Sequence, residues 1–235
     1  MKAIIFDMDG VLVDTMPFHY ESMKTAVDEI ANIELDKRTF YLLEGMPIKE
    51  MALEIFKLKG YDIKFERSRL SIMAEKVATR KKGIFMQMKQ IPESFNGVRE
   101  LILDSLRGCL KAVVTGSSKQ ELETIIEYNF GKDVFNVIIN GDEFEGKGKP
   151  DPASYIAALQ RLGIPPYHAL IVENAPLGVQ AANNAGIKCI VVLNSSPLSI
   201  LDFKGIKDEK IIFKDIKSAG IAIKDWCTTT IGTVE

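Results

Sequence analysis

The sequence predicts an α/β fold, a doubly wound (Rossmann-like) parallel sheet covered by helices, with an inserted α-helical bundle. From residue 110 onward, short runs that are apolar on both faces alternate with helical patterns. Such runs are typical of parallel strands buried between two layers of helices. Residues 16–92, between the first strand and the next, show helical periodicity and no clear strand, which predicts the inserted bundle.

Five segments are expected as strands because each is a short apolar run that ends in polar residues or glycine. They are residues 3–6, 111–114, 137–139, 169–172 and 188–192. Helix start and stop signals separate the later strands. Ser118 with Glu121 forms a capping box, Asp151 is expected as an N-cap before Pro152 in the first turn, and Gly163 is expected to end that helix.

The chain is therefore expected to contain two domains. Residues 1–15 and 93–235 would form the catalytic core, and residues 16–92 a helical cap with hinges at residues 15–17 and 90–92. The basic run of Arg80, Lys81 and Lys82 is interpreted as a solvated helix end.

The composition argues against several classes of partner. A net charge of −2 provides no basic field that would attract nucleic acid or an anionic membrane surface. Neither a signal-length apolar region nor a membrane-spanning stretch is found, so we expect a cytoplasmic protein. Cys109, Cys189 and Cys227 form no ligand cluster and are expected as reduced thiols.

Two aspartates follow the first predicted strand directly. Side chains alternate along a strand, so Asp7 and Asp9 are expected to face one crevice while Met8 turns away. Gly10 then permits a sharp turn. Two adjacent carboxylates repel one another unless a cation or a proton lies between them, and oxygen ligands favour Mg²⁺. In isolation, such a pair would by default be interpreted as two solvated turn carboxylates.

Polar residues also end three further predicted strands or precede their helices. Thr115 and Gly116 lead into a helix start, where backbone N–H groups suit a phosphate. Lys149 precedes a helix, and Glu173 and Asn174 end a strand. Each has an ordinary alternative as a helix cap or a surface charge. All would nevertheless converge at the carboxyl ends of parallel strands, where ligands bind in open α/β sheets.

The order of these motifs resembles the haloacid dehalogenase-like superfamily. The motifs are D-x-D-G-V-x-x-D-T, then T-G-S, then G-K-P-x-P, then V-E-N, and the resemblance extends from Lys2 to about Val192. The helical insertion resembles the subclass with an α-helical cap. The resemblance implies that Asp7 is a nucleophile that forms an aspartyl phosphate, and that Asp9 is the acid and base. Thr115 and the Gly116 N–H would hold the phosphoryl group, with Lys149 offsetting charge.

The resemblance also implies a Mg²⁺ ion between the Asp7 carboxylate, the Asp9 backbone carbonyl and the strand end at Glu173 and Asn174. The usual family pattern places an aspartate at the second of these last two positions. Here the residue is Asn174. The metal would then be held by a neutral amide oxygen or by a repositioned Glu173.

The function expected is a Mg²⁺-dependent phosphatase that acts on a small phosphorylated metabolite. The alternative is a sugar phosphate mutase of the β-phosphoglucomutase type. Such mutases place an arginine three residues after the cap-loop glycine, and this chain has Ile48 three residues after Gly45. A phosphoacceptor signalling module is a further alternative, but such modules have no large helical insertion.

Three cap residues are expected near the substrate, namely His19, Glu44 and Gly45. His19 follows a segment that resembles one in the mutases, where a histidine assists proton transfer. A plain helix-surface role for His19 is an equal alternative. The sequence does not identify the physiological substrate or the oligomeric state.

Overall fold

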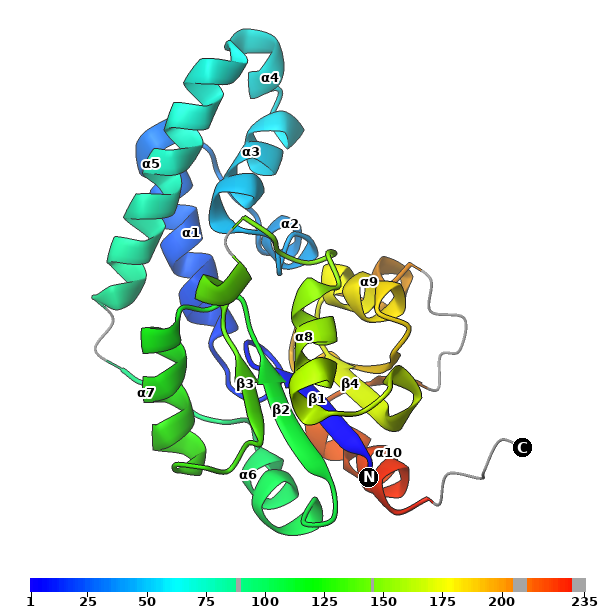
Figure 1. Ribbon diagram of the computed structural model, residues 1–235. Coiled ribbons are helices and arrows are strands. Elements are labelled where there is room, and N and C mark those ends of the chain that lie inside the picture. Colours follow the sequence, from blue (N-terminus) through cyan, green and yellow to red (C-terminus); the bar gives the residue numbers. More distant parts are fainter. Residues whose placement is uncertain (88–89, 145, 205–210, 230–235) are drawn as a thin grey trace.

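The computed structural model describes residues 1–87, 90–144, 146–204 and 211–229. Within these residues, parallel strands form one sheet in the order β3-β2-β1-β4-β5-β6 (Figure 1). Strand β1 is central, and it pairs with β2 on one side and β4 on the other. The strands are β1 (Ala3–Asp7), β2 (Leu110–Val114), β3 (Val137–Ile139), β4 (Ala169–Glu173), β5 (Lys188–Val192) and β6 (Ile212–Phe213).

Helices flank both faces of the sheet and form an insertion between β1 and β2. The insertion contains α1 (Met16–Ala31), α2 (Lys37–Leu42), α3 (Ile48–Leu58), α4 (Tyr61–Lys64) and α5 (Arg67–Met86). The core contains α6 (Val98–Glu100), a π-helix (Leu101–Ser105), α7 (Lys119–Phe130), α8 (Ala153–Leu162), α9 (Pro176–Asn184) and α10 (Ile216–Thr228), with 3₁₀ turns at Gly141–Phe144, Pro166–His168 and Ile200–Asp202. None of the helices in the described residues is long and apolar enough to cross a membrane.

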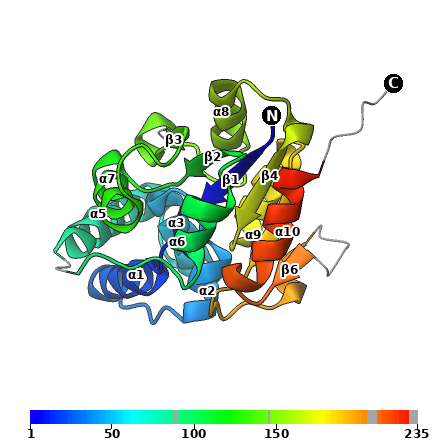
Figure 2. The ribbon, with the colours of Figure 1, turned by 90° about the horizontal axis from the view of Figure 1, so that it is seen from below.

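Strand β1 is buried on both faces because helices cover each side of the sheet (Figure 2). Ile5 packs toward α8 and α9, whereas Ile4 and Phe6 pack toward α7 and α10. All three side chains are fully buried. This explains why β1 is apolar at every position instead of alternating. The fold class expected from the sequence is confirmed.

The helical insertion forms a cap beside the carboxyl ends of the strands (Figure 1). Helix α5 packs against both α1 and α3. Their buried faces include Met23 and Val27 of α1, Ile55 of α3, and Ala74 and Val77 of α5. The expected insertion of helices α1–α5 is confirmed, while the exact domain boundaries at residues 15/16 and 92/93 and the hinges stay predictions.

Two details of the fold differ from expectation. Strand β6 was not predicted, because a two-residue edge strand carries too little pattern to be recognised. Helix α8 begins at Ala153, with Pro152 as its N-cap. The Asp151 carboxylate still accepts a hydrogen bond from the Ala153 N–H at 2.8 Å, so it stabilises the helix start from one residue further out than expected.

The expectation of three reduced thiols was wrong for two of the cysteines. Cys109 and Cys227 form a disulfide with a Cα–Cα distance of 5.8 Å, whereas Cys189 is free and buried. Cys109 lies just before β2, and Cys227 lies in the last turn of α10. The two cysteines are 118 residues apart in sequence, and only the packing of α10 beside the start of β2 brings them together. The bond attaches the C-terminal helix to the sheet.

Opening this disulfide should destabilise the fold, because the cross-link restricts the unfolded chain. A typical contribution is about 2–4 kcal/mol. We expect Cys227→Ser or treatment with a reductant to lower the melting temperature by several degrees, and the reductant to have no further effect on Cys227→Ser. Thermal melts test the stability. Three titratable thiols in denatured, unreduced protein, in place of one, would contradict the pairing.

Candidate active site

The turn after β1 places two aspartates at the edge of the sheet. Asp7 is the last residue of β1 and is buried, and Met8 is buried in the hydrophobic core. The chain turns at Gly10, which has a φ of +79°. A Cβ atom at Gly10 would lie 2.3 Å from Nδ2 of Asn174, so only glycine lets the turn approach the end of β4 this closely.

The Asp9 carboxylate accepts hydrogen bonds from four side chains. Oδ1 accepts from the Thr15 hydroxyl at 2.6 Å and lies 3.2 Å from His19 Nε2. Oδ2 accepts from the hydroxyls of Thr115 at 2.7 Å and Ser117 at 3.0 Å. Burial alone would raise the pKa of Asp9, but the contacts with His19, Thr15 and Thr115 outweigh it and hold that pKa well below its usual range. In this arrangement Asp9 is therefore ionised.

Lys149 lies between two buried carboxylates. Its ammonium group donates to Asp7 Oδ1 at 2.5 Å and also to Glu173 Oε1. Burial opposes the charge of Lys149, but the carboxylates of Asp7 and Glu173 outweigh burial and hold the pKa of Lys149 well above its ordinary value. The lysine is thus a fixed positive charge that touches the predicted nucleophile.

Glu173 is fully buried and both of its oxygens are engaged. Oε1 accepts from Lys149 and from the Tyr155 hydroxyl at 2.6 Å. Oε2 accepts from the backbone N–H groups of Asn174 at 2.9 Å and Ala175 at 3.1 Å. With four donors around it, the carboxylate positions Lys149 and the end of β4. A metal would have to displace one of these donors to bind Glu173.

Two buried oxygens beside this network have no hydrogen-bond partner among the described residues. They are Asp7 Oδ2 and Asn174 Oδ1. Burial raises the pKa of Asp7, and Glu173 and Asp9 raise it further against the effect of Lys149, so an added cation would stabilise the ionised form. Carboxylate and amide oxygens suit a hard cation such as Mg²⁺. The side chains of Asp7 and Asn174 therefore fit a Mg²⁺ ion, with the Asp9 backbone carbonyl as the further ligand that the sequence predicts.

That donor set contains few carboxylates. Within the described ranges, no group of three or more His, Cys, Asp or Glu side chains is arranged to hold a metal. The fit rests instead on one carboxylate, one side-chain amide and one backbone carbonyl.

Glu44 reaches this site from the cap. It lies between α2 and α3, and its two carboxylate oxygens accept from Asn174 Nδ2 at 3.1 and 3.0 Å. Burial, followed by the charge of Asp7, raises the pKa of Glu44 well above its ordinary value. The adjacent Gly45 packs against the Lys149 side chain, where a Cβ atom would approach Cδ to 2.8 Å. The cap loop is therefore in close contact with the core.

A second cap contact connects His19 of α1 with Lys81 of α5. Lys81 Nζ lies 2.8 Å from His19 Nδ1, on the opposite side of the ring from Asp9. The His19 ring also stacks on Phe85 at a centroid distance of 4.3 Å. Burial lowers the pKa of Lys81 to about 8, while Glu121 and Asp9 oppose that shift. Burial and the Lys81 charge lower the pKa of His19.

The interpretation of Arg80, Lys81 and Lys82 as a solvated helix end was wrong for Lys81, which is only 7% exposed. The sequence did contain a signal for its burial. Lys81 falls in the same helical stripe as the buried residues Leu70, Ala74, Val77 and Phe85, with spacings of three and four. Arg80, in contrast, forms an exposed ion pair with Glu29.

A cavity of about 110 Å³ lies between cap and core beside these residues. Its polar lining includes Asp9, His19, Glu44, Lys81 and Ser117. Its apolar lining comes mainly from the cap and consists of Met16, Met23, Phe40, Met46, Ile48 and Met51. The arrangement leaves room for a compact group beside Asp9 and Ser117.

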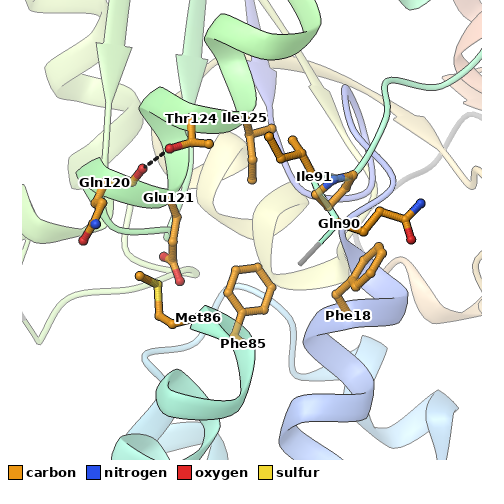
Figure 3. Close-up of a pocket in the computed structure, with 10 residues that line it drawn as sticks. Phe18, Phe85, Met86, Gln90, Ile91, Gln120, Glu121, Thr124 and Ile125 are labelled. Atoms are coloured by element: carbon orange, nitrogen blue, oxygen red, sulfur yellow. Dashed lines mark hydrogen bonds between the residues drawn. The ribbon is translucent and has the colours of Figure 1, made fainter. Parts of the chain in front are cut away.

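A separate hollow of about 150 Å³ lies between α1, α5 and α7 (Figure 3). Its lining is largely apolar and includes Phe18, Met86 and Ile125. None of the residues expected to be catalytic lines it. Phe85 lines this hollow and also stacks on His19, so it separates the hollow from the active site.

The parallel sheet, the helical cap and the aspartate pair at the end of the central strand together define a capped α/β enzyme of the hydrolase class. The chain belongs to the haloacid dehalogenase-like hydrolase family, whose sequence model matches residues 4–192. The family, the fold class and the enzyme class expected from the sequence are therefore confirmed. Proteins of this family typically depend on a metal ion.

Curated relatives and solved structures support the assignment. The chain is 32% identical to the phosphorylated carbohydrates phosphatase of Thermotoga maritima over 81% of this chain and 84% of that protein. It is 26% identical to the beta-phosphoglucomutase of Bacillus subtilis over 84% of this chain and 86% of that protein. A solved structure from Bacteroides vulgatus is similar at 28% identity and a TM-score of 0.79, covering 96% of this chain and 88% of that chain.

The structure gathers the residues predicted from the sequence around one crevice. The predicted residues found there are Asp7, Asp9, His19, Glu44, Gly45, Thr115, Gly116, Lys149, Glu173 and Asn174. Sequence reasoning missed Thr15, Lys81, Ser117 and Tyr155, which hydrogen-bond to members of that set. The roles of the predicted residues stay predictions.

Burial of Lys81 should make stability depend on pH. The unfolded lysine has a pKa near 10.5 and the folded one about 8. Between these values the unfolded chain binds more protons, so the free energy of unfolding rises with pH from about 8 upward. Lys81→Met removes a buried charge and should stabilise the protein at pH 7 by about 1–3 kcal/mol, with a smaller gain near pH 10.

Urea unfolding at both pH values measures this difference, with the exposed neighbour Lys82 changed to Met as the matched control. A stability gain for Lys81→Met that is equal at both pH values would contradict the assignment.

Proposed function

We propose that this protein is a Mg²⁺-dependent phosphatase that hydrolyses a small phosphorylated metabolite through an aspartyl phosphate on Asp7. The observation that carries the proposal is the environment of the Asp7 carboxylate. Lys149 fixes Oδ1, while Oδ2 is buried without a partner among the described residues. The carboxylate is therefore oriented and has capacity left for a phosphoryl group and a cation. Asp9 lies two residues further on.

In the first step the Asp7 carboxylate attacks phosphorus, the bond from phosphorus to the leaving oxygen breaks, and Asp9 gives that oxygen a proton. In the second step Asp9 takes a proton from water, which attacks the aspartyl phosphate and releases inorganic phosphate. Both steps depend mainly on positioning and charge stabilisation.

The contacts of Asp9 explain how it acquires the proton. Thr115 and Ser117 donate to Asp9 Oδ2 in this structure. In the proposal both hydroxyls donate to a phosphoryl oxygen when substrate is bound. Loss of the Thr115 hydrogen bond would raise the pKa of Asp9, and His19 at Oδ1 would provide a route for the proton.

Positive charge is supplied from two sources. Lys149 offsets the charge of Asp7 and of the phosphate. A Mg²⁺ ion held by Asp7, the Asp9 backbone carbonyl and Asn174 would neutralise phosphoryl oxygens. The two unpartnered buried oxygens support this site.

The substrate class follows from the cavity and the relatives. A cavity of about 110 Å³ supports a compact leaving group. The Thermotoga maritima relative is a phosphorylated carbohydrates phosphatase, which supports a small sugar phosphate as the substrate. With net charge −2, nucleic acid and membrane surfaces are not proposed as partners. A cytoplasmic location also stays a proposal.

A phosphoglucomutase activity is the second candidate, supported by the similarity to the Bacillus subtilis enzyme. The position at which such mutases would carry an arginine is Ile48, and Ile48 lines the cavity as an apolar residue. This favours hydrolysis, because the cap offers no guanidinium at that position for a second phosphate.

The proposed mechanism assigns different roles to the two aspartates, so their substitutions should have different effects. Asp7→Asn should abolish release of phosphate from p-nitrophenyl phosphate with Mg²⁺, because an amide is a poor nucleophile. Asp9→Asn should reduce turnover by about 10²- to 10⁴-fold and leave a covalent phosphoryl adduct on Asp7. Phosphate release and intact-protein mass spectrometry measure the two effects.

Asp104→Asn is the matched control, because it makes the same change in charge at an exposed residue of the core. An Asp7→Asn protein with near wild-type turnover would exclude the covalent mechanism.

A second prediction separates phosphatase from mutase. With a panel of sugar monophosphates and Mg²⁺, we expect release of inorganic phosphate from at least one small sugar phosphate. Glucose 1-phosphate with glucose 1,6-bisphosphate should not be converted into glucose 6-phosphate, because Ile48 provides no charge for a second phosphate. Coupled detection of glucose 6-phosphate measures this. Rapid isomer formation without phosphate release would favour the mutase instead.

A further inference from the structure

The contact between Glu44 of the cap and Asn174 of the core joins two parts of the site that approach from different domains. Both oxygens of Glu44 accept from the amide nitrogen of Asn174, at 3.1 and 3.0 Å. Asn174 is 2% exposed, and its amide oxygen has no hydrogen-bond partner among the described residues. Among the described residues, the cap hydrogen-bonds to this amide through its nitrogen.

The chemistry of the two groups fixes the orientation of the amide. Both Glu44 oxygens lie at hydrogen-bond distance from the amide nitrogen, and an amide nitrogen only donates hydrogen bonds. Glu44 therefore holds the nitrogen toward the cap, and the amide oxygen is left for a cation. The opposite orientation would turn the amide oxygen, which only accepts, toward two Glu44 oxygens of which at most one can carry a proton.

The position of Glu44 depends on close packing of the cap loop on the core. A Cβ atom at Gly148 would lie 2.6 Å from the Gly45 carbonyl oxygen, and one at Gly45 would lie 2.8 Å from Lys149 Cδ. Only glycine fits at either point. The loop that carries Glu44 therefore packs closely against the loop that carries Lys149. This contact places the Glu44 carboxylate beside Asn174.

The identity of residue 174 is matched to this cap residue. Glu44 already lies near two other buried acidic residues, Asp7 and Glu173. An aspartate at position 174 would add a carboxylate at hydrogen-bond distance from Glu44. A neutral amide avoids that repulsion and still provides an oxygen for the metal.

We propose that Glu44 is a positioning residue that, when the cap is closed, orients the Asn174 amide so that its oxygen faces the cation, and that Asn174 is neutral because Glu44 is acidic. We name this pair the Glu44–Asn174 latch. The proposal rests on the metal site of the proposed function. It connects closure of the cap to completion of the metal site.

The test exchanges the two groups. In Glu44→Gln/Asn174→Asp the amide lies on the cap and the carboxylate on the core, so the same hydrogen bond can form with donor and acceptor reversed. Asn174→Asp alone places two carboxylates in contact. The dissociation constant of Mn²⁺, followed by its EPR signal without substrate, and the melting temperature without metal are measured for the wild type, both single variants and the double variant.

We expect Asn174→Asp alone to lower the melting temperature of the metal-free protein, and the double variant to restore it. We expect Mn²⁺ to bind the double variant at least about tenfold more tightly than it binds Asn174→Asp alone. Glu50→Gln, an exposed cap residue that loses the same charge, should not rescue Asn174→Asp. If Asn174→Asp fails to fold, folding of the double variant is the expected result.

The latch would be overturned if the effects of the two substitutions were additive on both measurements. For the Mn²⁺ dissociation constant, additive means within about twofold of the product of the two single effects. Loss of all Mn²⁺ binding in Glu44→Gln alone would also overturn it, because Glu44 would then be a direct ligand. A wild-type protein that binds no Mn²⁺ would overturn the metal site together with the latch. Intact binding with additive effects would overturn the latch alone.

Discussion

The repulsion between carboxylates buried at one end of the sheet is the constraint on which the rest of this site depends. Like charges in a dry site disfavour ionisation unless each finds a compensating partner. The partners differ from one carboxylate to the next, and they are Lys149 for Asp7 and Glu173, hydroxyls and His19 for Asp9, and the Asn174 amide for Glu44. The parallel sheet makes this possible because β1, β2 and β4 all end at the same edge.

The cap takes part in this compensation, so its contribution goes beyond excluding water. His19 and Glu44 both come from the insertion, and each contacts a core residue that is expected to act on the phosphate or hold the metal. Lys81 contacts the far side of the His19 ring. A movement of the cap away from the core would remove these contacts from Asp9 and Asn174. Closure of the cap about the predicted hinges would therefore change the charge environment of the core residues at the same time as it encloses the cavity.

The extent to which the site could be predicted depends on how local each signal is. Asp7, Asp9, Thr115 and Asn174 follow apolar strands directly, and parallel strand ends must converge, so the sequence sufficed to group them. The burial of Lys81 depends on the rotation of α5 about its axis, which places one lysine of a basic run on the buried face. The spacing of the apolar residues of α5 is the sequence signal for that rotation. Tyr155 needed the packing of α8 on the sheet. The pairing of Cys109 with Cys227 could not be predicted without the position of α10, and no motif in the sequence fixes that position.

The charge of the completed site also bears on its need for a metal. Asp7, Asp9, Glu44 and Glu173 outnumber the lysines that contact the site, Lys149 and Lys81. Lys149 is already shared between two carboxylates, so it offsets only part of the charge of a bound phosphate. A phosphate ester is itself dianionic near neutral pH, and it would enter a site with four acidic side chains and two lysines. A divalent cation held by Asp7 and Asn174 would offset that negative charge for the phosphoryl group. A neutral ligand at position 174 would leave more of the cation's charge for the phosphate than an aspartate would.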